Sequence, residues 1–351
     1  MKNDKLVMGA VGIVIGIIAV ALVILGNPAN MGFCIACFVR DTVGALGMHR
    51  AAPVQYIRPE IIGLILGAYV LSMIRGEHQS RGGSSPIIRF ILGFFVMIGA
   101  LIFLGCPLRM ILRLGGGDLN ALFGIAGFAG GVGIGTIFLK SGYSLQRTYA
   151  LSKLESAIMP AIQVGLLVLV VTAPAFIFFS QKGPGAMHAP WLISLAAGLV
   201  VGGLSQYSRL CTVGGFRDLF LFKKSVLIFG YIAVLVGVFA VNISFGNFHL
   251  GFENQPVSHT DGLWNFLGMA LAGFCSVLLG GCPLRQLIMT GEGNSDSAVT
   301  VLGLAAGAAF AHNFGLAASG AGPTLNGQIA VGIGFVVALI IAVLNTKRSN
   351  A

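Results

Sequence analysis

Long apolar segments follow one another along this chain, and they constrain its fold more than any other feature. A helix that crosses a bilayer needs roughly 20 mostly apolar residues. Such stretches predict ten spans, at 6–26, 60–75, 87–105, 120–140, 159–180, 190–207, 225–245, 262–281, 298–316 and 326–345. Because 56% of the 351 residues are hydrophobic and only 9% are charged, the chain lacks the polar residues that a soluble surface requires. The sequence therefore predicts an all-α polytopic membrane protein and excludes soluble enzymes and free nucleic-acid-binding domains.

The first apolar segment could be mistaken for a cleaved signal sequence. It runs from Leu6 to Leu25, and no small-residue cleavage site follows it. A signal core is shorter, about 7–15 residues, so we expect this segment to be a span. The polar connections between spans are short. We therefore expect a single integral membrane domain over residues 1–351, with no separate soluble domain.

Lysine and arginine residues predict the orientation, because they are enriched in cytoplasmic loops. With the N-terminus inside, 15 of the 21 fall on the cytoplasmic side, Lys347 and Arg348 among them, and 6 fall outside. The outside set is Arg40, Arg50, Arg58, Arg109, Arg113 and Lys182. We expect both termini in the cytoplasm and an even number of crossings.

Two short motifs occur twice, in the same order. The segments 34–41 (CIACFVRD) and 211–218 (CTVGGFRD) both read C-x5-R-D, and GCPLR stands at 105–109 and again at 281–285. The copies are offset by 177 and 176 residues, which indicates an internal repeat. We place repeat one at about 6–180 and repeat two at about 190–345. Five predicted spans precede the second copy, so we expect it to be inverted in the membrane.

The motif segments are apolar, yet they are too short and too interrupted by Gly and Pro to be full spans. Non-helical backbone at membrane depth is tolerated where protein or a cavity surrounds it. We therefore expect four re-entrant half-helices, a pair from each face, that meet near the middle of the membrane.

The GCPLR motif combines three features that suit a small anion with a soft, polarisable atom. Pro favours the first position of a helix, which places the preceding Cys at the positive end of the helix dipole, where free N–H groups attract anions. An Arg follows one turn later, and the Gly leaves room for a close approach. Ionisable residues at membrane depth are candidates for function. The candidate residues are Gly105, Cys106, Pro107 and Arg109 in the first copy, and Gly281, Cys282, Pro283 and Arg285 in the second.

The C-x5-R-D motif leaves more than one interpretation open. Its sulfurs are Cys34, with Cys37 in a C-x-x-C, and Cys211; its charged residues are Arg40, Asp41, Arg217 and Asp218. The charged residues could support an anion, or they could brace the backbone as ion pairs. The C-x-x-C could form a disulfide on an oxidising face. No second C-x-x-C or His pair completes a zinc site, so we expect no metal and no cofactor. Cys275 has no counterpart in repeat one, and we interpret it as a core residue.

At these residues the chain resembles the YeeE/YedE family of membrane proteins, over nearly its whole length. Its form is most similar to the YedE branch, which is associated with selenium transport, whereas the YeeE branch takes up thiosulfate. The resemblance implies an hourglass-like protein of the bacterial cytoplasmic (inner) membrane, with nine or ten transmembrane helices. It also implies that thiols in series pass the anion along by hydrogen bonding. By motif match these are Cys106, Cys282 and either Cys34 or Cys37, with Cys211 added by the repeat. A small TusA-like sulfur carrier on the cytoplasmic side is a possible partner.

The leading hypothesis is therefore a non-enzymatic transporter that takes up a sulfur- or selenium-containing anion. A membrane thiol oxidoreductase that uses Cys34 and Cys37 is the alternative, although the remaining sulfurs are isolated in the sequence. A scaffold that only docks a partner is the third, and under it the GCPLR motifs would have no role in uptake.

Overall fold

The computed structural model describes residues 2–346 of the chain, and it is an all-α polytopic membrane protein. The first half contains α1 (Lys2–Ile24), α2 (Ile35–Ala45), the 3-10 turn η1 (Ala52–Val54), α3 (Pro59–Ile74), α4 (Pro86–Ile102), α5 (Pro107–Gly115), α6 (Asn120–Lys140) and α7 (Lys153–Thr172). The second half contains α8 (Trp191–Ser208), α9 (Thr212–Phe222), α10 (Val226–Ser244), α11 (Gly262–Leu279), α12 (Pro283–Gly291), α13 (Ser295–Asn313) and α14 (Leu325–Leu344). A short antiparallel pair, β1 (Arg81–Gly82) and β2 (Tyr149–Ala150), joins two loops.

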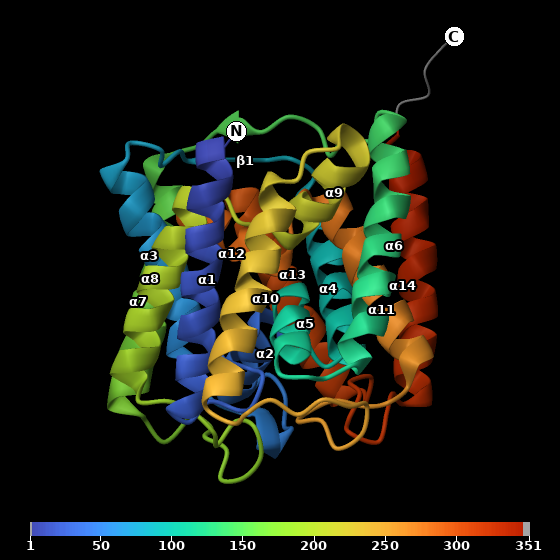
Figure 1. Ribbon diagram of the computed structural model, residues 1–351. Helices are drawn as coiled ribbons and strands as arrows, with labels where there is room; N and C mark the ends of the chain where they lie inside the picture. Colours follow the sequence, from blue (N-terminus) through green and yellow to red (C-terminus); the bar gives the residue numbers. More distant parts are fainter. Residues whose placement is uncertain (1, 347–351) are drawn as a thin grey trace.

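Long and short helices follow the same order in the two halves. Helices α2 and α9 have 11 residues each, and α5 and α12 have 9 each. At 1.5 Å per residue these helices cover only about half of a bilayer core of about 30 Å. Figure 1 shows α2 and α5 in the lower part of the molecule and α9 and α12 in the upper part. This order matches the four half-helices that the motifs predict.

The two halves are interlocked rather than side by side. Helix α1 packs on α10 while α3 packs on α8, and α6 packs on α11 while α4 packs on α13. Every one of these pairs joins the first half to the second. The half-helices also contact helices of the other half: α2 contacts α13, and α9 contacts α6. The core is thus built jointly by both halves, and neither half encloses the half-helices alone.

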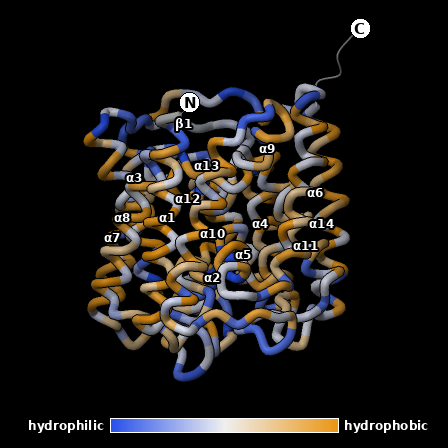
Figure 2. Tube along the Cα trace, in the orientation of Figure 1, coloured by the Kyte–Doolittle hydropathy of each residue, from blue (hydrophilic) through white to orange (hydrophobic). Residues whose placement is uncertain are grey.

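Two polar ends flank an apolar middle (Figure 2). We call the end where α1 begins the N-terminal face, and the other end the opposite face (Figure 1). At the N-terminal face the 75–85 loop contacts the 141–152 loop and the end of α12. At the opposite face the 46–58 loop contacts the 173–190 loop, and the 116–119 turn contacts the 245–261 loop. Large apolar side chains such as Ile137, Val171 and Leu339 remain exposed on the flanks, as expected for surfaces that face lipid.

Each of the ten predicted spans corresponds to a helix, with one boundary clearly wrong. The span predicted at 159–180 is helical over Lys153–Thr172 instead. Ala173 adopts a left-handed conformation (φ 41°) directly before Pro174, and a residue before Pro is disfavoured in a helix. The following residues pack as a loop on α2, where Phe178 N–H donates to Ala45 O.

Nine helical stretches within residues 2–346 are long and apolar enough to cross a membrane. Helix α13 is not among them, because its sequence is rich in Ala, Gly and polar residues. The predictions for Lys347 and Arg348 lie outside the described residues.

Glycines on α6 allow a very close contact with α11. An ideal Cβ added at Gly127 or Gly131 would lie 2.0 Å from a carbonyl oxygen of α11. Gly303 and Gly307 on α13 meet the backbone of α4 in the same way. Small residues allow this close approach between transmembrane helices, so these glycines form the packing faces between α6 and α11 and between α13 and α4.

We expect Gly131→Ala to destabilise the protein by about 1–3 kcal/mol, because the added methyl group would overlap Ala270 O. The matched control is Gly130→Ala, where the nearest atom to the added methyl is Phe266 Cζ at 3.8 Å. Thermal unfolding in detergent measures both. Equal melting temperatures for the two variants would contradict the packing argument.

Candidate functional site

Each half-helix begins immediately after a cysteine. Within residues 2–346 the N-cap residues of α2, α5, α9 and α12 are Cys34, Cys106, Cys211 and Cys282. Their side chains are between 0% and 6% exposed. The half-helices end near the loops of the two faces, while their first residues contact one another inside the protein. The positive ends of four helix dipoles and four thiols therefore meet in the buried centre.

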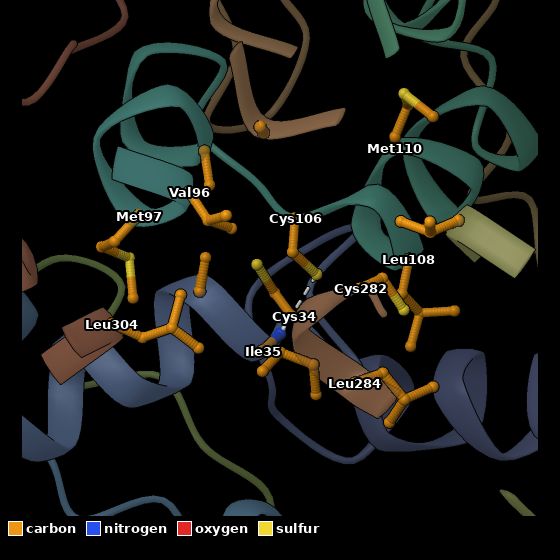
Figure 3. Packing of buried hydrophobic residues seen from close by; sticks show 14 of the residues in the cluster. Cys34, Ile35, Val96, Met97, Cys106, Leu108, Met110, Cys282, Leu284 and Leu304 are labelled. Carbon is orange, nitrogen blue, oxygen red and sulfur yellow. Dashed lines mark hydrogen bonds between the residues drawn. The ribbon is translucent and has the colours of Figure 1, made fainter. Parts of the chain in front are cut away.

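The first sulfur pair consists of Cys34 and Cys106. The backbone N–H of Ile35, the first residue of α2, donates to Cys106 Sγ at 3.3 Å, as the dashed line in Figure 3 shows. Cys34 Sγ accepts from the N–H of Cys37 at 3.4 Å. The Sγ atoms of Cys34 and Cys37 are 2.7 Å apart, and both residues are free thiols. The sulfurs thus satisfy N–H groups that would otherwise be unpaired at the start of α2.

The second sulfur pair consists of Cys211 and Cys282, whose Sγ atoms are 3.8 Å apart. Cys211 Sγ accepts from the N–H of Gly214 at 3.3 Å, and the Cys211 thiol donates to Cys282 Sγ. In both pairs the GCPLR sulfur therefore lies against the start of the other motif's half-helix: Cys106 accepts from the first N–H of α2, and Cys282 contacts the N-cap sulfur of α9. Gly214 takes the place of Cys37, so the C-x-x-C is specific to the first half.

Tyr231 on α10 binds the backbone beside the first sulfur pair, and the sequence analysis missed it. Its hydroxyl donates to the carbonyl of Pro107, next to Cys106, and its helix α10 also packs on α9, whose N-cap is Cys211. The residue is 3% exposed. Its signal in the sequence is the single phenol in a mostly apolar span, 226–244.

The two GCPLR arginines have different partners. Arg109 is fully buried and donates to the carbonyls of Asn30 and Val257, each at 3.2 Å. Among the described residues its Nη1 has no hydrogen-bond partner and no carboxylate pairs with it. Arg285 forms a bidentate ion pair with Glu292, with two N–O distances of 3.0 Å. The guanidinium near the first sulfur pair is therefore not neutralised, whereas the one near the second pair is.

The glycine of each GCPLR motif makes room for the arginine that follows. An ideal Cβ at Gly105 would lie 2.9 Å from Arg109 Cδ, and one at Gly281 would lie 3.0 Å from Arg285 Cγ. Each arginine side chain thus folds back across the backbone of its own motif. Pro107 and Pro283 occupy the first helical positions, as predicted.

The charged residues of the C-x5-R-D motifs form ion pairs. Arg40 and Arg58 both bind Asp41, at 2.6 and 2.7 Å, and all three side chains are at most 4% exposed. Arg58 also donates to the carbonyls of the 173–190 loop. Arg217 pairs with Asp218 at 2.8 Å, but these side chains are 31% and 21% exposed. The geometry favours the bracing role for Arg40 and Asp41, and it places Arg217 and Asp218 away from the sulfurs, toward the N-terminal face.

A polar cavity of about 350 Å³ opens at the opposite face. Asn30, Asn242 and Gln255 are among its lining residues, and Asn30 also accepts the hydrogen bond from Arg109. A much smaller void next to this cavity shares Asn30 with it and is also lined by Leu112 of α5 and Val238 of α10. The four N-cap cysteines are not among the lining residues of either space and are buried in the centre. The described conformation therefore has a polar vestibule between the opposite face and Arg109, and it is closed at the buried sulfur pairs.

Comparisons with known proteins agree with these motifs. Residues 207–346 match the family model described as "Sulphur transport", a segment that contains Cys211 and Cys282. The chain is also similar to the thiosulfate transporter TsuA of Escherichia coli (strain K12), with 27% identity over 115 residues. This alignment covers 30% of the chain and 30% of that protein. Both matches agree with the resemblance of the chain to the YeeE/YedE family.

We expect Tyr231→Phe to lower the free energy of unfolding by about 0.5–1.5 kcal/mol, because it removes the hydroxyl that joins α10 to Pro107. Tyr207→Phe is the control, since Tyr207 is 48% exposed on α8. Thermal unfolding in detergent compares the two. A loss of stability in Tyr207→Phe that matched or exceeded that in Tyr231→Phe would argue against the link.

Proposed function

We propose that this YeeE/YedE-type protein is a transporter, not an enzyme, and that it takes up a small sulfur-containing anion, with thiosulfate as the first candidate and its selenium analogues in the same class. The observation that carries the proposal is the convergence of Cys34, Cys106, Cys211 and Cys282 at four buried helix N-termini. The family description and the thiosulfate transporter relative support the same chemistry.

The proposed path suits this substrate class for two physical reasons. Helix N-termini favour negative charge without requiring a counter-charge on a side chain. Thiols are weak hydrogen-bond donors with a soft, polarisable sulfur, and thiosulfate and its selenium analogues offer a soft terminal atom of the same kind. A thiolate would repel an anion, so the thiols act as neutral donors and no redox change is needed. The anion passes from the first sulfur pair to the second by exchanging hydrogen-bond donors.

Cys34, rather than Cys37, belongs to this path. Cys34 is the N-cap of α2 and lies beside Cys106 (Figure 3). Cys37 lies within the first turn of α2, where its sulfur contacts Cys34 and, at 3.9 Å, the carbonyl of Leu104. Its thiol therefore contacts Cys34 within the helix and does not take the place of Cys34 in the path.

Arg109 gives the path its attraction for anions. It is a buried cation without a carboxylate partner among the described residues, and it lies between the polar vestibule and the first sulfur pair. An uncompensated buried charge costs several kcal/mol, and an arriving anion would remove that cost. The vestibule side is therefore where the anion is captured.

We further propose that the two halves form an inverted repeat and that the N-terminal face is cytoplasmic. Of the six Lys and Arg residues expected outside, Arg50 and Lys182 are exposed, while Arg40, Arg58, Arg109 and Arg113 are buried. The ratio of exposed Lys and Arg residues at the N-terminal face to those at the opposite face is thus larger than a count of all Lys and Arg residues suggests. This bias supports a bacterial inner-membrane protein with cytoplasmic termini. A TusA-like sulfur carrier would then receive the sulfur at the N-terminal face.

The alternative function is a thiol oxidoreductase, and the 2.7 Å separation of the Cys34 and Cys37 sulfurs is the observation that favours it. Both residues are fully buried, which impedes exchange with an external dithiol. Non-reducing mass spectrometry separates the two readings, because a Cys34–Cys37 disulfide that forms and breaks during turnover would favour the oxidoreductase.

We expect Cys106→Ala and Cys282→Ala each to reduce thiosulfate uptake into proteoliposomes at least about tenfold, the effect of losing a hydrogen bond worth about 1.4 kcal/mol. Cys275→Ala is the control, because Cys275 is equally buried but lies in the core of α11. Size-exclusion profiles establish that the variants fold. Full uptake by both Cys106→Ala and Cys282→Ala would overturn the thiol path.

We expect Arg109→Gln to raise the thiosulfate concentration at half-maximal uptake about tenfold or more, since hydrogen bonds to charged groups are worth about 1.5–3 kcal/mol. Lys182→Gln, an exposed charge on the same face, should change it little. Arg109→Lys keeps the charge and should recover part of the affinity. Equal half-saturation values for Arg109→Gln and Lys182→Gln would show that Arg109 does not bind the anion.

A further inference from the structure

Five charged side chains form a connected network at the N-terminal face, outside the sulfur pairs. We call them the ionic latch; they are Arg75, Glu77, Arg209, Arg285 and Glu292. They come from the end of α3 and the loop after it, from the end of α8, and from α12. The network thus joins the first half of the chain to the second at one end of the molecule.

Arg209 is the centre of the latch. Its Nη1 donates to Glu292 Oε1 at 2.6 Å and its Nη2 donates to Glu77 Oε2 at 2.7 Å. Glu77 also pairs with Arg75 at 2.9 Å, and Arg285 holds Glu292 from the other side. The Glu292 side chain is 4% exposed, whereas that of Arg209 is 45% exposed. The latch therefore runs from the protein interior to solvent.

The latch is attached directly to the second sulfur pair. Arg209 stands two residues before Cys211, in a left-handed conformation (φ 58°) that is uncommon for a residue other than Gly. Arg285 lies one turn after Cys282, and Glu292 is the C-cap of α12. The carbonyl of Glu292 also accepts from the N–H of Gln79 in the 75–85 loop. Movement of Arg209 or Glu292 would therefore be transmitted to the two cysteines.

The latch holds more positive than negative charge. Three guanidinium groups share two carboxylates, and the Arg75 guanidinium, together with the Gln206 amide, holds the pKa of Glu77 below its usual value. Glu77 is thus ionised at neutral pH. A small anion that leaves the second sulfur pair would meet the guanidinium groups of Arg209 and Arg285. The carboxylates of Glu77 and Glu292 now occupy the positions where that anion would bind.

We propose that Arg209 and Arg285 form the release site for the transported anion, and that Glu77 and Glu292 occupy this site between transport events. The proposal rests on the function argued above. The anion competes with Glu292 for Arg285 and displaces it, Arg209 swings toward solvent, and the anion leaves at the N-terminal face. When the site is empty the carboxylates return and close it.

The contrast with the other end of the path supports this assignment. Arg109 lacks a carboxylate partner in the described residues, so an anion binds there without displacing an internal group. At Arg285 the anion has to compete with a carboxylate already in place. The same motif therefore captures the anion in one half and releases it in the other. In the first half Asp118 pairs with Arg113, not with Arg109.

The test measures how readily a bulky maleimide alkylates Cys282 in the full-length protein purified in detergent, with each alkylated cysteine identified by mass spectrometry. We expect Glu77→Gln and Arg209→Gln each to raise the Cys282 rate about threefold to tenfold, since exposed ion pairs contribute up to about 1 kcal/mol and part of this network is buried. The alkylation rate of Cys106 in the same sample is the internal control, because Cys106 belongs to the first sulfur pair and the latch is attached to the second. Lys224→Gln removes an exposed charge at the same face and should leave the Cys282 rate unchanged.

Two further measurements sharpen the result. The double variant Glu77→Gln/Arg209→Gln should raise the Cys282 alkylation rate by less than the product of the two single-variant increases, because the two side chains act in one network. In Glu292→Gln, thiosulfate should protect Cys282 from alkylation at a concentration about tenfold lower than in the parent protein, because the internal competitor is gone.

Unchanged Cys282 alkylation in Glu77→Gln and Arg209→Gln would overturn the release site, and so would equal thiosulfate protection in Glu292→Gln and the parent. Neither result would affect the uptake test with Cys106→Ala and Cys282→Ala. If those two variants transport thiosulfate fully, it is the proposed function that fails. The two failures are therefore distinguishable.

Discussion

The structure depends on how the backbone N–H groups at the starts of four buried half-helices are satisfied. These groups lie in an apolar interior, where an unpaired N–H costs free energy comparable to a lost hydrogen bond. Sulfur atoms supply part of the answer: Cys106 accepts from the start of α2, and Cys34 and Cys211 accept from the first turns of their own helices. Because thiols are weak acceptors, these N–H groups remain available to a stronger acceptor. A small anion that reaches the centre is such an acceptor, so one arrangement both supports the fold and favours substrate.

Electrostatics then distinguish two halves that share their sequence motifs. Both GCPLR arginines fold back over a glycine, but within residues 2–346 only Arg285 meets a carboxylate. Carbonyl oxygens hold Arg109 in place without neutralising it. A path with an unneutralised cation at one end and a neutralised one at the other is not symmetric for an anion. The difference arises from residues outside the motifs, namely the loop carbonyls around Arg109 and the Glu292 that follows α12.

Much of the architecture was predictable, because hydropathy and motif spacing are local properties. The ten long helices and the half-helix at each motif correspond to predicted segments. The end of α7 was not, because an apolar run continues past Thr172 while the backbone turns at Ala173 and Pro174. The β1–β2 pair was also missed, since two residues on each side carry no periodic signal. Tyr231 and the ionic latch were missed for a different reason: each depends on contacts between residues more than 100 positions apart, or on partners in different helices.

The sequence by itself determined that this chain is a helical membrane protein, that its motifs are duplicated, and that the two GCPLR cysteines stand at helix starts. Those properties follow from the apolar length a bilayer requires and from the preference of Pro for the first turn of a helix. Only the tertiary structure decided which sulfurs meet, that Tyr231 binds the carbonyl of Pro107, and that Arg109 lacks, among residues 2–346, the carboxylate that Arg285 has. Charge neutralisation and hydrogen bonding act over a few ångströms between segments far apart in the chain, so the packing of α5, α10 and α12 had to be known before their partners could be named.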